Sequence, residues 1–311
     1  MHASRRIALA TPSMPNAGQS ALPLSLDAAE LSRLARTVQH AALGAGEIVR
    51  NAALTSSSLV WEHKGTADFV SEVDRDAEQH ILSVIEKEFP GAVVIGEEFS
   101  PDAVSGRGLS FIIDPLDGKT NFLHGFPHYA VSIGAAHGAD LLAAAVLNVP
   151  TRELFAATAG GGATRDGAPI RASTETVPQR ALIGTGFPFK QVEHLPGFLR
   201  QFEAVTRSTA GVRRAGSAAL DLADTACGRF DAFWELGLAP WDVAAGILLI
   251  REAGGLITDL EGAHATPAFG AYVAGGPAMH EWLSRTLKEA GAGSARHQAQ
   301  VTSHQSLVTN H

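Results

Sequence analysis

The sequence is poor in several features that whole classes of protein require. Its 311 residues contain a single cysteine, Cys227, which excludes an intrachain disulfide and a zinc site made of thiolates. Positive charge is also scarce: 24 Lys and Arg residues against 32 Asp and Glu residues give a formal net charge of −8, which argues against a nucleic-acid partner. No run approaches the roughly 20 apolar residues of a membrane-spanning helix. We therefore expect a cytoplasmic protein with neither a membrane nor a nucleic-acid partner, in which an anionic substrate would need bound cations.

Both ends of the chain lack apolar periodicity. Residues 1–24 hold a short apolar run that stops at Thr11-Pro12-Ser13, too early for a secretory signal. The segment 291–311 is polar and carries three of the 13 histidines, but a segment without packing cannot fix a metal site. We expect disordered tails over 1–24 and 291–311 around one domain at 25–290.

Between these tails, helical and extended patterns alternate. Asp27 and Glu30 have the spacing of a helix capping box, and apolar residues then recur every three or four positions up to Val49. A second helix is predicted to start at Asp74 and to stop at Pro90-Gly91. Further helices are expected at 217–227, 242–253 and 278–289. Strands are expected at 92–95, 109–113, 129–135, 142–147, 153–157, 232–235, 256–258 and 272–274, with a hairpin turn at Asp166-Gly167. The alternation predicts a layered α/β fold.

The most informative segment is Phe111-Ile-Ile-Asp114-Pro-Leu-Asp117-Gly118, in which an apolar strand runs into two acids. Carboxylates at the end of a buried strand are costly unless a cation meets them. Gly118 lets the backbone approach a ligand closely, and the N–H groups of residues 118–120 would form an anion-binding nest. The segment therefore suits a metal-bound phosphate, although by itself it is equally compatible with a hydrogen-bonded turn that binds nothing.

Further acids lie where expected strands end or helices begin. They are Asp68 and Asp74 near the second helix, Glu97 and Glu98 after a short apolar strand, and Asp242 at a helix start. Taken singly, Glu98 reads as a solvated neighbour and Asp242 as a helix N-cap. Together with the two acids of the strand end they form an all-oxygen set, which favours a hard cation such as Mg²⁺ over zinc or copper.

These residues, with several other blocks, resemble the signature of the inositol monophosphatases, the lithium-sensitive, Mg²⁺-dependent phosphomonoesterases. The further blocks are Lys64-Gly-Thr-Ala-Asp68, Gly184-Thr-Gly-Phe-Pro-Phe-Lys190, Arg213-Arg-Ala-Gly-Ser-Ala-Ala-Leu-Asp-Leu-Ala223, Phe233-Trp-Glu235, Trp241-Asp242 and Gly254-Gly255. The resemblance covers residues 27–290 and is to the bacterial branch. It implies a five-layer αβαβα sandwich, usually a homodimer, with the metals between two α/β halves that meet near residues 180–190.

The resemblance also implies a role for individual residues. Two to three Mg²⁺ ions would be held by Glu97, Asp114, the carbonyl of Leu116, Asp117 and Asp242, with Asp68 and Asp74 orienting ligands from further out. The substrate, a small phosphorylated polyol, would contact Glu97, Leu116, Asp117, Gly118, Lys119, Arg213, Gly216, Ser217, Ala218, Glu235 and Asp242. The catalytic groups would be Glu97, Asp114, Asp117, Asp242, Lys119 and Thr120.

The implied reaction is attack of a metal-activated water, held by Glu97, on the phosphate ester. No covalent phosphoenzyme is needed, and Cys227 falls in an apolar helical pattern that indicates a core thiol. His124 and His128 follow the acidic loop closely, but a leaving oxygen stabilised by a metal does not require an imidazole. We therefore assign no general acid to either histidine.

Lys119 departs from the family pattern, which has a threonine directly after the Asp-Gly pair. A lysine cannot replace a short hydroxyl that both donates and accepts hydrogen bonds. Three outcomes are open: Lys119 points to the phosphate, it points away while Glu97 alone orders the water, or the protein is a weak catalyst. We expect activity that is retained but reduced.

Asn121-Phe122 and the residues that follow favour inositol monophosphate as the substrate, because they resemble the inositol branch. Histidinol phosphate, fructose 1,6-bisphosphate and adenosine 3′,5′-bisphosphate are the alternatives among related phosphatases. A hypothesis of another class is a protein-binding scaffold whose catalytic power has been eroded at Lys119.

Overall fold

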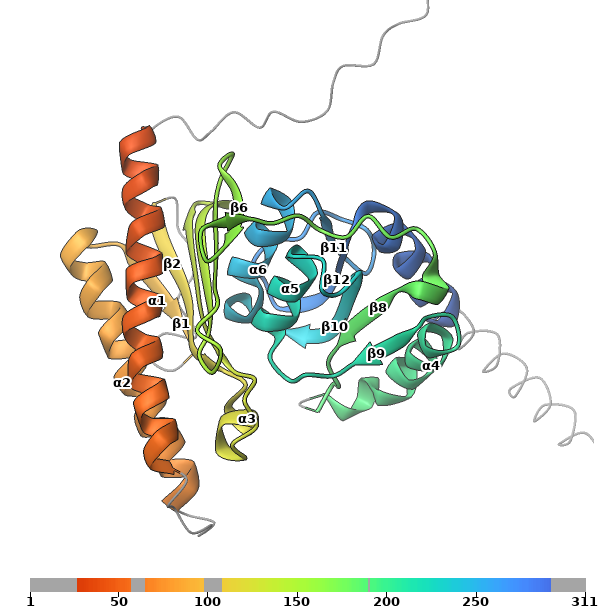
Figure 1. Ribbon diagram of the computed structural model, residues 1–311, viewed down its shortest axis with the longest axis horizontal. Helices are drawn as coiled ribbons and strands as arrows, with labels where there is room; N and C mark the ends of the chain where they lie inside the picture. The colour runs from red at the N-terminus through yellow and green to blue at the C-terminus, as the bar shows by residue number, and fades with distance from the viewer. Residues whose placement is uncertain (1–26, 57–64, 98–107, 190, 292–311) are drawn as a thin grey trace, which may run out of the picture.

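The computed structural model describes residues 27–56, 65–97, 108–189 and 191–291. Five layers lie side by side in this part of the chain: two helices, a sheet, two helices, a second sheet and two outer helices (Figure 1). The predicted layered α/β class is confirmed. Glu98 and the expected tails, apart from Gly291 at the end of a helix, lie outside the described residues, and the expected domain limits stay predictions.

Helices α1 (Ala28–Ser56) and α2 (Gly65–Glu88) form the first layer. The predicted capping box is confirmed, because the Glu30 N–H donates to Asp27 Oδ1 over 2.8 Å and the Asp27 N–H donates to Glu30 Oε2 over 3.3 Å. The predicted start of the second helix at Asp74 is wrong. Asp74 lies inside α2 with a fully buried side chain, so it meets a distant partner instead of capping the helix.

The first sheet has seven strands in chain order, β1 to β7, and only the pairing of β1 with β2 is parallel. The strands are β1 (Val93–Gly96), β2 (Leu109–Asp117), β3 (Ala130–His137), β4 (Asp140–Asn148), β5 (Leu154–Thr158), β6 (Gly162–Arg165) and β7 (Ala168–Pro169). Asp166 and Gly167 have φ of 50° and 79°, which confirms the predicted hairpin turn. Strand β2 continues beyond the predicted residue 113, with a shift of register between Asp114 and Asp117.

The second sheet has the order β11-β12-β10-β8-β9. Its strands are β8 (Leu182–Thr185), β9 (Gly211–Arg213), β10 (Ala232–Leu238), β11 (Leu256–Asp259) and β12 (Gly270–Gly275). Two short 3-10 turns, η1 (Pro178–Arg180) and η2 (Val192–His194), precede β8 and the helix α4 (Leu195–Thr206). The sequence analysis predicted neither the helix α4 nor the strands β8 and β9. The two strands are too short to show an alternation of apolar and polar residues. Helix α4 and the helix over 277–291 pack on the outer face of this sheet.

The middle layer holds α5 (Ala218–Ala226) and α6 (Pro240–Glu252) between the two sheets. Both are apolar on nearly all sides, as expected of helices that pack against a sheet on each face. Gly134 of β3 permits the close approach of α6, because a Cβ at this position would lie 2.9 Å from the Cβ of Ala244. The start of α6 is thereby held against the first sheet, next to the end of β2. Among the described residues, no helix is long and apolar enough to cross a membrane.

Candidate functional site

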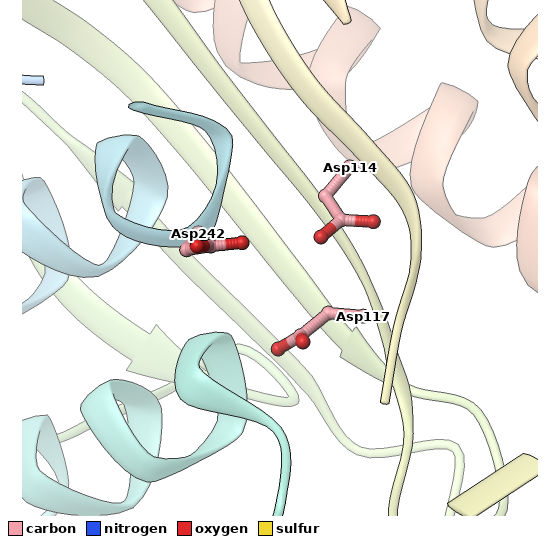
Figure 2. A group of neighbouring side chains, drawn as sticks. All are labelled: Asp114, Asp117 and Asp242. Atoms are coloured by element: carbon pink, nitrogen blue, oxygen red, sulfur yellow. The ribbon is translucent and has the colours of Figure 1, made fainter. Parts of the chain in front are cut away.

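Three aspartates from two parts of the chain meet where the first sheet faces the middle helices. Asp114 and Asp117 lie on β2 and Asp242 lies in the first turn of α6 (Figure 2). One carboxylate oxygen from each lies within 4.8 Å of the others. We call these three residues the aspartate trio. Within the described ranges, no histidine or cysteine belongs to this group, so its donors are the hard oxygens that Mg²⁺ prefers.

Each member of the trio is held in a fixed direction by hydrogen-bond donors. Asp117 Oδ2 accepts from Ser217 Oγ over 2.7 Å and from the backbone N–H of Ala219 over 2.8 Å, at the start of α5. Asp242 Oδ2 accepts from the N–H of Ala239 over 2.7 Å, and Asp114 Oδ1 accepts from the N–H of Leu116 over 3.0 Å. These neutral donors orient the carboxylates but leave their combined negative charge in place.

The electrostatics of the trio call for a cation. Burial raises the pKa of Asp114 well above its usual range, and the negative charges of Asp117 and Glu97 raise it further. Burial also raises the pKa of Asp117, although its hydrogen bonds from Ser217 and Ala219 act in the opposite direction. Such shifts mean that the carboxylates repel one another in a medium of low polarity. A divalent ion fits the trio by charge and by donor type.

The side chain of Lys119 is directed at two acids, an orientation that the sequence analysis did not consider. Its Nζ lies 2.6 Å from Glu97 Oε2 and 2.8 Å from Asp74 Oδ2. Burial alone would lower the pKa of Lys119, but the negative charges of Asp114, Asp74 and Glu97 outweigh it and raise that pKa. The ammonium group is therefore charged and is held between two of the acids that the sequence singled out.

A cavity of about 420 Å³ contains the trio and most of the residues expected to contact a substrate. Its lining includes Glu97, Asp114, Leu116, Asp117, Gly118, Lys119, Thr120, Gly216, Ser217, Ala218, Glu235 and Asp242. Arg213 is not in this lining: its side chain is exposed, and its Nη1 donates to the carbonyl of Val212. The neighbouring Arg214 lines the cavity instead, with its guanidinium 4.9 Å from the ring centre of Phe189. Asp68 belongs to α2, but its side chain is not among those that the structure describes.

Several residues of the site carried no assigned role in the sequence analysis. Asn121 Nδ2 donates to the carbonyl of His128 over 2.7 Å and to that of Ala215 over 2.9 Å, and so it ties the acidic loop to the Gly216 turn. Asp221 is buried in α5, and burial raises its pKa well above the usual range. The signal that could have found Asp221 is an acid inside an otherwise apolar helical run.

His124, His128 and Cys227 lie outside the aspartate trio. Neither His124 nor His128 is among the residues lining the cavity. His128 Nε2 lies 3.8 Å from Asp221 Oδ1, and burial lowers the pKa of His128. Cys227 follows α5 and donates from Sγ to the carbonyl of Asp224, and burial raises its pKa. A thiol in this state is a weak nucleophile.

We expect Asp114→Asn to stabilise the metal-free protein. A raised pKa means that the charged form of Asp114 is disfavoured in the fold, so stability is lost as pH rises from the usual aspartate pKa of about 3.9 through the raised value. Asparagine keeps the oxygen that accepts from Leu116 without the charge. Calorimetry in EDTA at pH 7.5 should show a melting temperature about 3 °C above that of wild type, with the difference vanishing near pH 4. A lower melting temperature at neutral pH would contradict this reading of the trio.

Comparison with known proteins places the chain among a well-populated group. A model of the inositol monophosphatase family matches residues 30–292. A protein of Pseudomonas aeruginosa named Nus factor SuhB is 43% identical over 253 residues, 80% of this chain and 93% of the relative. The inositol-1-monophosphatase of Rhizobium meliloti is 42% identical over 226 residues, 73% of this chain and 84% of the relative. The solved inositol monophosphatase of Anabaena (Nostoc) sp. has a TM-score of 0.75 and 34% identity, covering 83% of this chain and 96% of that one.

Proposed function

This chain belongs to the inositol monophosphatase family, and from that premise we propose that it is a Mg²⁺-dependent phosphomonoesterase that converts myo-inositol 1-phosphate and water to inositol and phosphate. The observation that carries the proposal is the aspartate trio, which gathers three oriented carboxylates in one cavity. Carboxylates without a histidine or cysteine suit Mg²⁺. A bound Mg²⁺ ion promotes the hydrolysis of phosphate esters, because it polarises the phosphoryl group and activates water.

The trio and the carbonyl of Leu116 would hold Mg²⁺, and the family resemblance implies Glu97 as a further ligand, although Glu97 contacts Lys119. When bound, Mg²⁺ would offset the charge of the phosphate and make a coordinated water a stronger nucleophile at neutral pH. The family resemblance implies two to three such ions. The residues themselves supply fixed carboxylate directions, since Ser217, Ala219 and Ala239 donate to the trio.

The turn at Gly118 is suited to receive the phosphate. Gly118 has φ of 92°, and a Cβ there would lie 3.0 Å from the carbonyl oxygen of His128. Only glycine fits this left-handed, crowded position without strain. The turn leads into the short helix α3 (Lys119–Leu123), and Gly118, Lys119 and Thr120, whose amides form the expected nest, are among the residues that line the cavity. They would donate hydrogen bonds to phosphate oxygens.

The far wall of the cavity would receive the alcohol part of the substrate. It is formed by Glu235, the Gly216 turn and Arg214. Burial raises the pKa of Glu235 well above its usual range, and the charge of Asp221 raises it further, so the carboxyl group can donate as well as accept hydrogen bonds. A cavity of about 420 Å³ holds a small polyol phosphate. We further propose a homodimer in the cytoplasm that lithium inhibits, in keeping with the family resemblance.

The substrate class is tested by a panel of phosphate esters assayed with Mg²⁺. We expect myo-inositol 1-phosphate to give the highest kcat/KM among itself, histidinol phosphate, fructose 1,6-bisphosphate and adenosine 3′,5′-bisphosphate. The reason is that Glu235 and Arg214 in the cavity lining offer hydrogen bonds to a ring of hydroxyls. Release of phosphate is the measurement. A tenfold preference for any other ester would move the assignment to that branch.

A second candidate function is a protein-binding scaffold with little catalysis. Two observations favour it: some relatives carry the name Nus factor, and Lys119 occupies the position between Glu97 and Asp74. This candidate predicts that the wild-type protein is as inert toward the panel as Asp114→Asn. The phosphatase proposal predicts that the two differ.

A further inference from the structure

Lys119 lies where two acidic side chains converge. Its ammonium is 2.6 Å from Glu97 Oε2 and 2.8 Å from Asp74 Oδ2, and both contacts have the length of a charge-assisted hydrogen bond. The Asp74 side chain is 0% exposed, against 25% for Glu97 and 29% for Lys119. This is a largely buried cation between carboxylate oxygens, and not an exposed ion pair of small energetic weight.

The acids of the site divide into two sets. Asp114, Asp117 and Asp242 bring their oxygens within 4.8 Å of one another. Glu97 is not a member of that group, because its carboxylate is turned to Lys119. The Lys119 ammonium contacts Glu97 and Asp74, whereas the groups that orient the trio, Ser217 and the backbone N–H groups of Leu116, Ala219 and Ala239, are neutral. The charge of Lys119 also acts on Asp114.

A divalent ion that used Glu97 would have to displace the ammonium. Moving Lys119 out would remove the cation that lies 2.8 Å from the fully buried Asp74, and removing one partner of a buried ion pair is destabilising. A threonine at position 119 would present no charge and would not compete in this way. The identity of residue 119 therefore bears on how many ions the cavity accepts.

We propose that the Lys119 ammonium is a built-in cation that takes the place of one divalent ion at Glu97. The chain then holds one divalent ion fewer than its Lys119→Thr variant, and the ion it does hold lies at the aspartate trio. The inference rests on the proposed function only in that it concerns the ions of the same site. It concerns ion binding, which is measured without any turnover.

The test is a count of the Mn²⁺ ions bound per chain. Mn²⁺ is titrated up to millimolar concentration, and electron paramagnetic resonance measures the ion that remains free. We expect Lys119→Thr and Lys119→Met to bind one ion more than wild type. Lys119→Arg keeps the charge and is the matched control, so its count should equal that of wild type. Asp242→Asn should lose the ion of the trio in either background.

The outcomes separate this inference from the proposed function. An equal count in wild type and Lys119→Thr, with one ion still lost in Asp242→Asn, overturns the role of Lys119 and leaves metal-dependent hydrolysis standing. No ion in any variant overturns both.

A second readout distinguishes this role from simple structural support. Without metal, Lys119→Met should melt about 5 °C below wild type, because Asp74 and Glu97 lose their cation. Saturating Mn²⁺ should bring the melting temperature of Lys119→Met most of the way back to that of wild type. The melting temperature of Lys119→Arg should equal that of wild type with and without Mn²⁺. A loss that Mn²⁺ does not restore would show that the lysine only supports the fold, and would overturn the inference.

Discussion

Asp242→Asn is expected to lower kcat for phosphate release by about 10³-fold, because it removes one charged oxygen ligand from the aspartate trio. The fold should survive the change. Asp242 Oδ2 accepts from the N–H of Ala239 at the start of α6, and an asparagine oxygen can accept the same hydrogen bond. The loss would therefore come from the missing charge and not from a broken helix end. Steady-state kinetics with saturating Mg²⁺ gives the number.

The control for this variant is another acid with the same local role. Glu30 accepts from the N–H of Asp27 at the start of α1, as Asp242 accepts from that of Ala239 at the start of α6, but Glu30 lies outside the cavity. Glu30→Gln should change kcat less than twofold. If Asp242→Asn kept more than about a tenth of the wild-type kcat while remaining folded, the trio would not be the metal site of the reaction.

The second large effect is expected for Lys119→Thr, which should raise kcat by about tenfold. The threonine hydroxyl can donate to one oxygen and accept from another, as a group that orders an attacking water must, whereas an ammonium only donates. Removing the ammonium also releases Glu97, which now accepts from Nζ over 2.6 Å. The measurement is kcat with myo-inositol 1-phosphate over a range of Mg²⁺ concentrations, since the variant is expected to need more of the ion.

Lys119→Val is the matched control, because valine has the shape of threonine without its hydroxyl. Valine should reproduce the release of Glu97 but not the ordering of water, and its kcat should remain below that of the threonine variant. An unchanged or lower kcat in Lys119→Thr would mean that Lys119 itself supports catalysis. In that case the turn at Gly118 would depend on the lysine for activity.

Local features of the fold could be predicted from the sequence. The capping box of Asp27 and Glu30 and the turn at Asp166-Gly167 depend on residues that are close in the chain, and the structure has both. The start of α2 could not be predicted in this way. An aspartate is common at the first turn of a helix, but Asp74 lies inside α2 and meets Lys119 across the fold.

The candidate site shows the same division between local and distant determinants. The expected ligands Asp114, Asp117 and Asp242 do converge, since acids at strand ends and helix starts meet at one edge of a layered fold. Arg213 ends β9 and Arg214 follows it, and no local pattern shows which of the two lines the cavity. The orientation of Lys119 is set by Asp74 of α2 and by Glu97, which follows β1.

The most direct test is phosphate release from the four esters by wild type and by Asp114→Asn, each with and without Mg²⁺. We predict release from myo-inositol 1-phosphate only by the wild-type protein and only with Mg²⁺, while Asp114→Asn remains folded and inert. Asp114 is the residue to change because its buried carboxylate faces both Asp117 and Glu97. Equal rates for the two proteins, or no release from any ester by wild type at saturating Mg²⁺, would contradict metal-dependent phosphate hydrolysis.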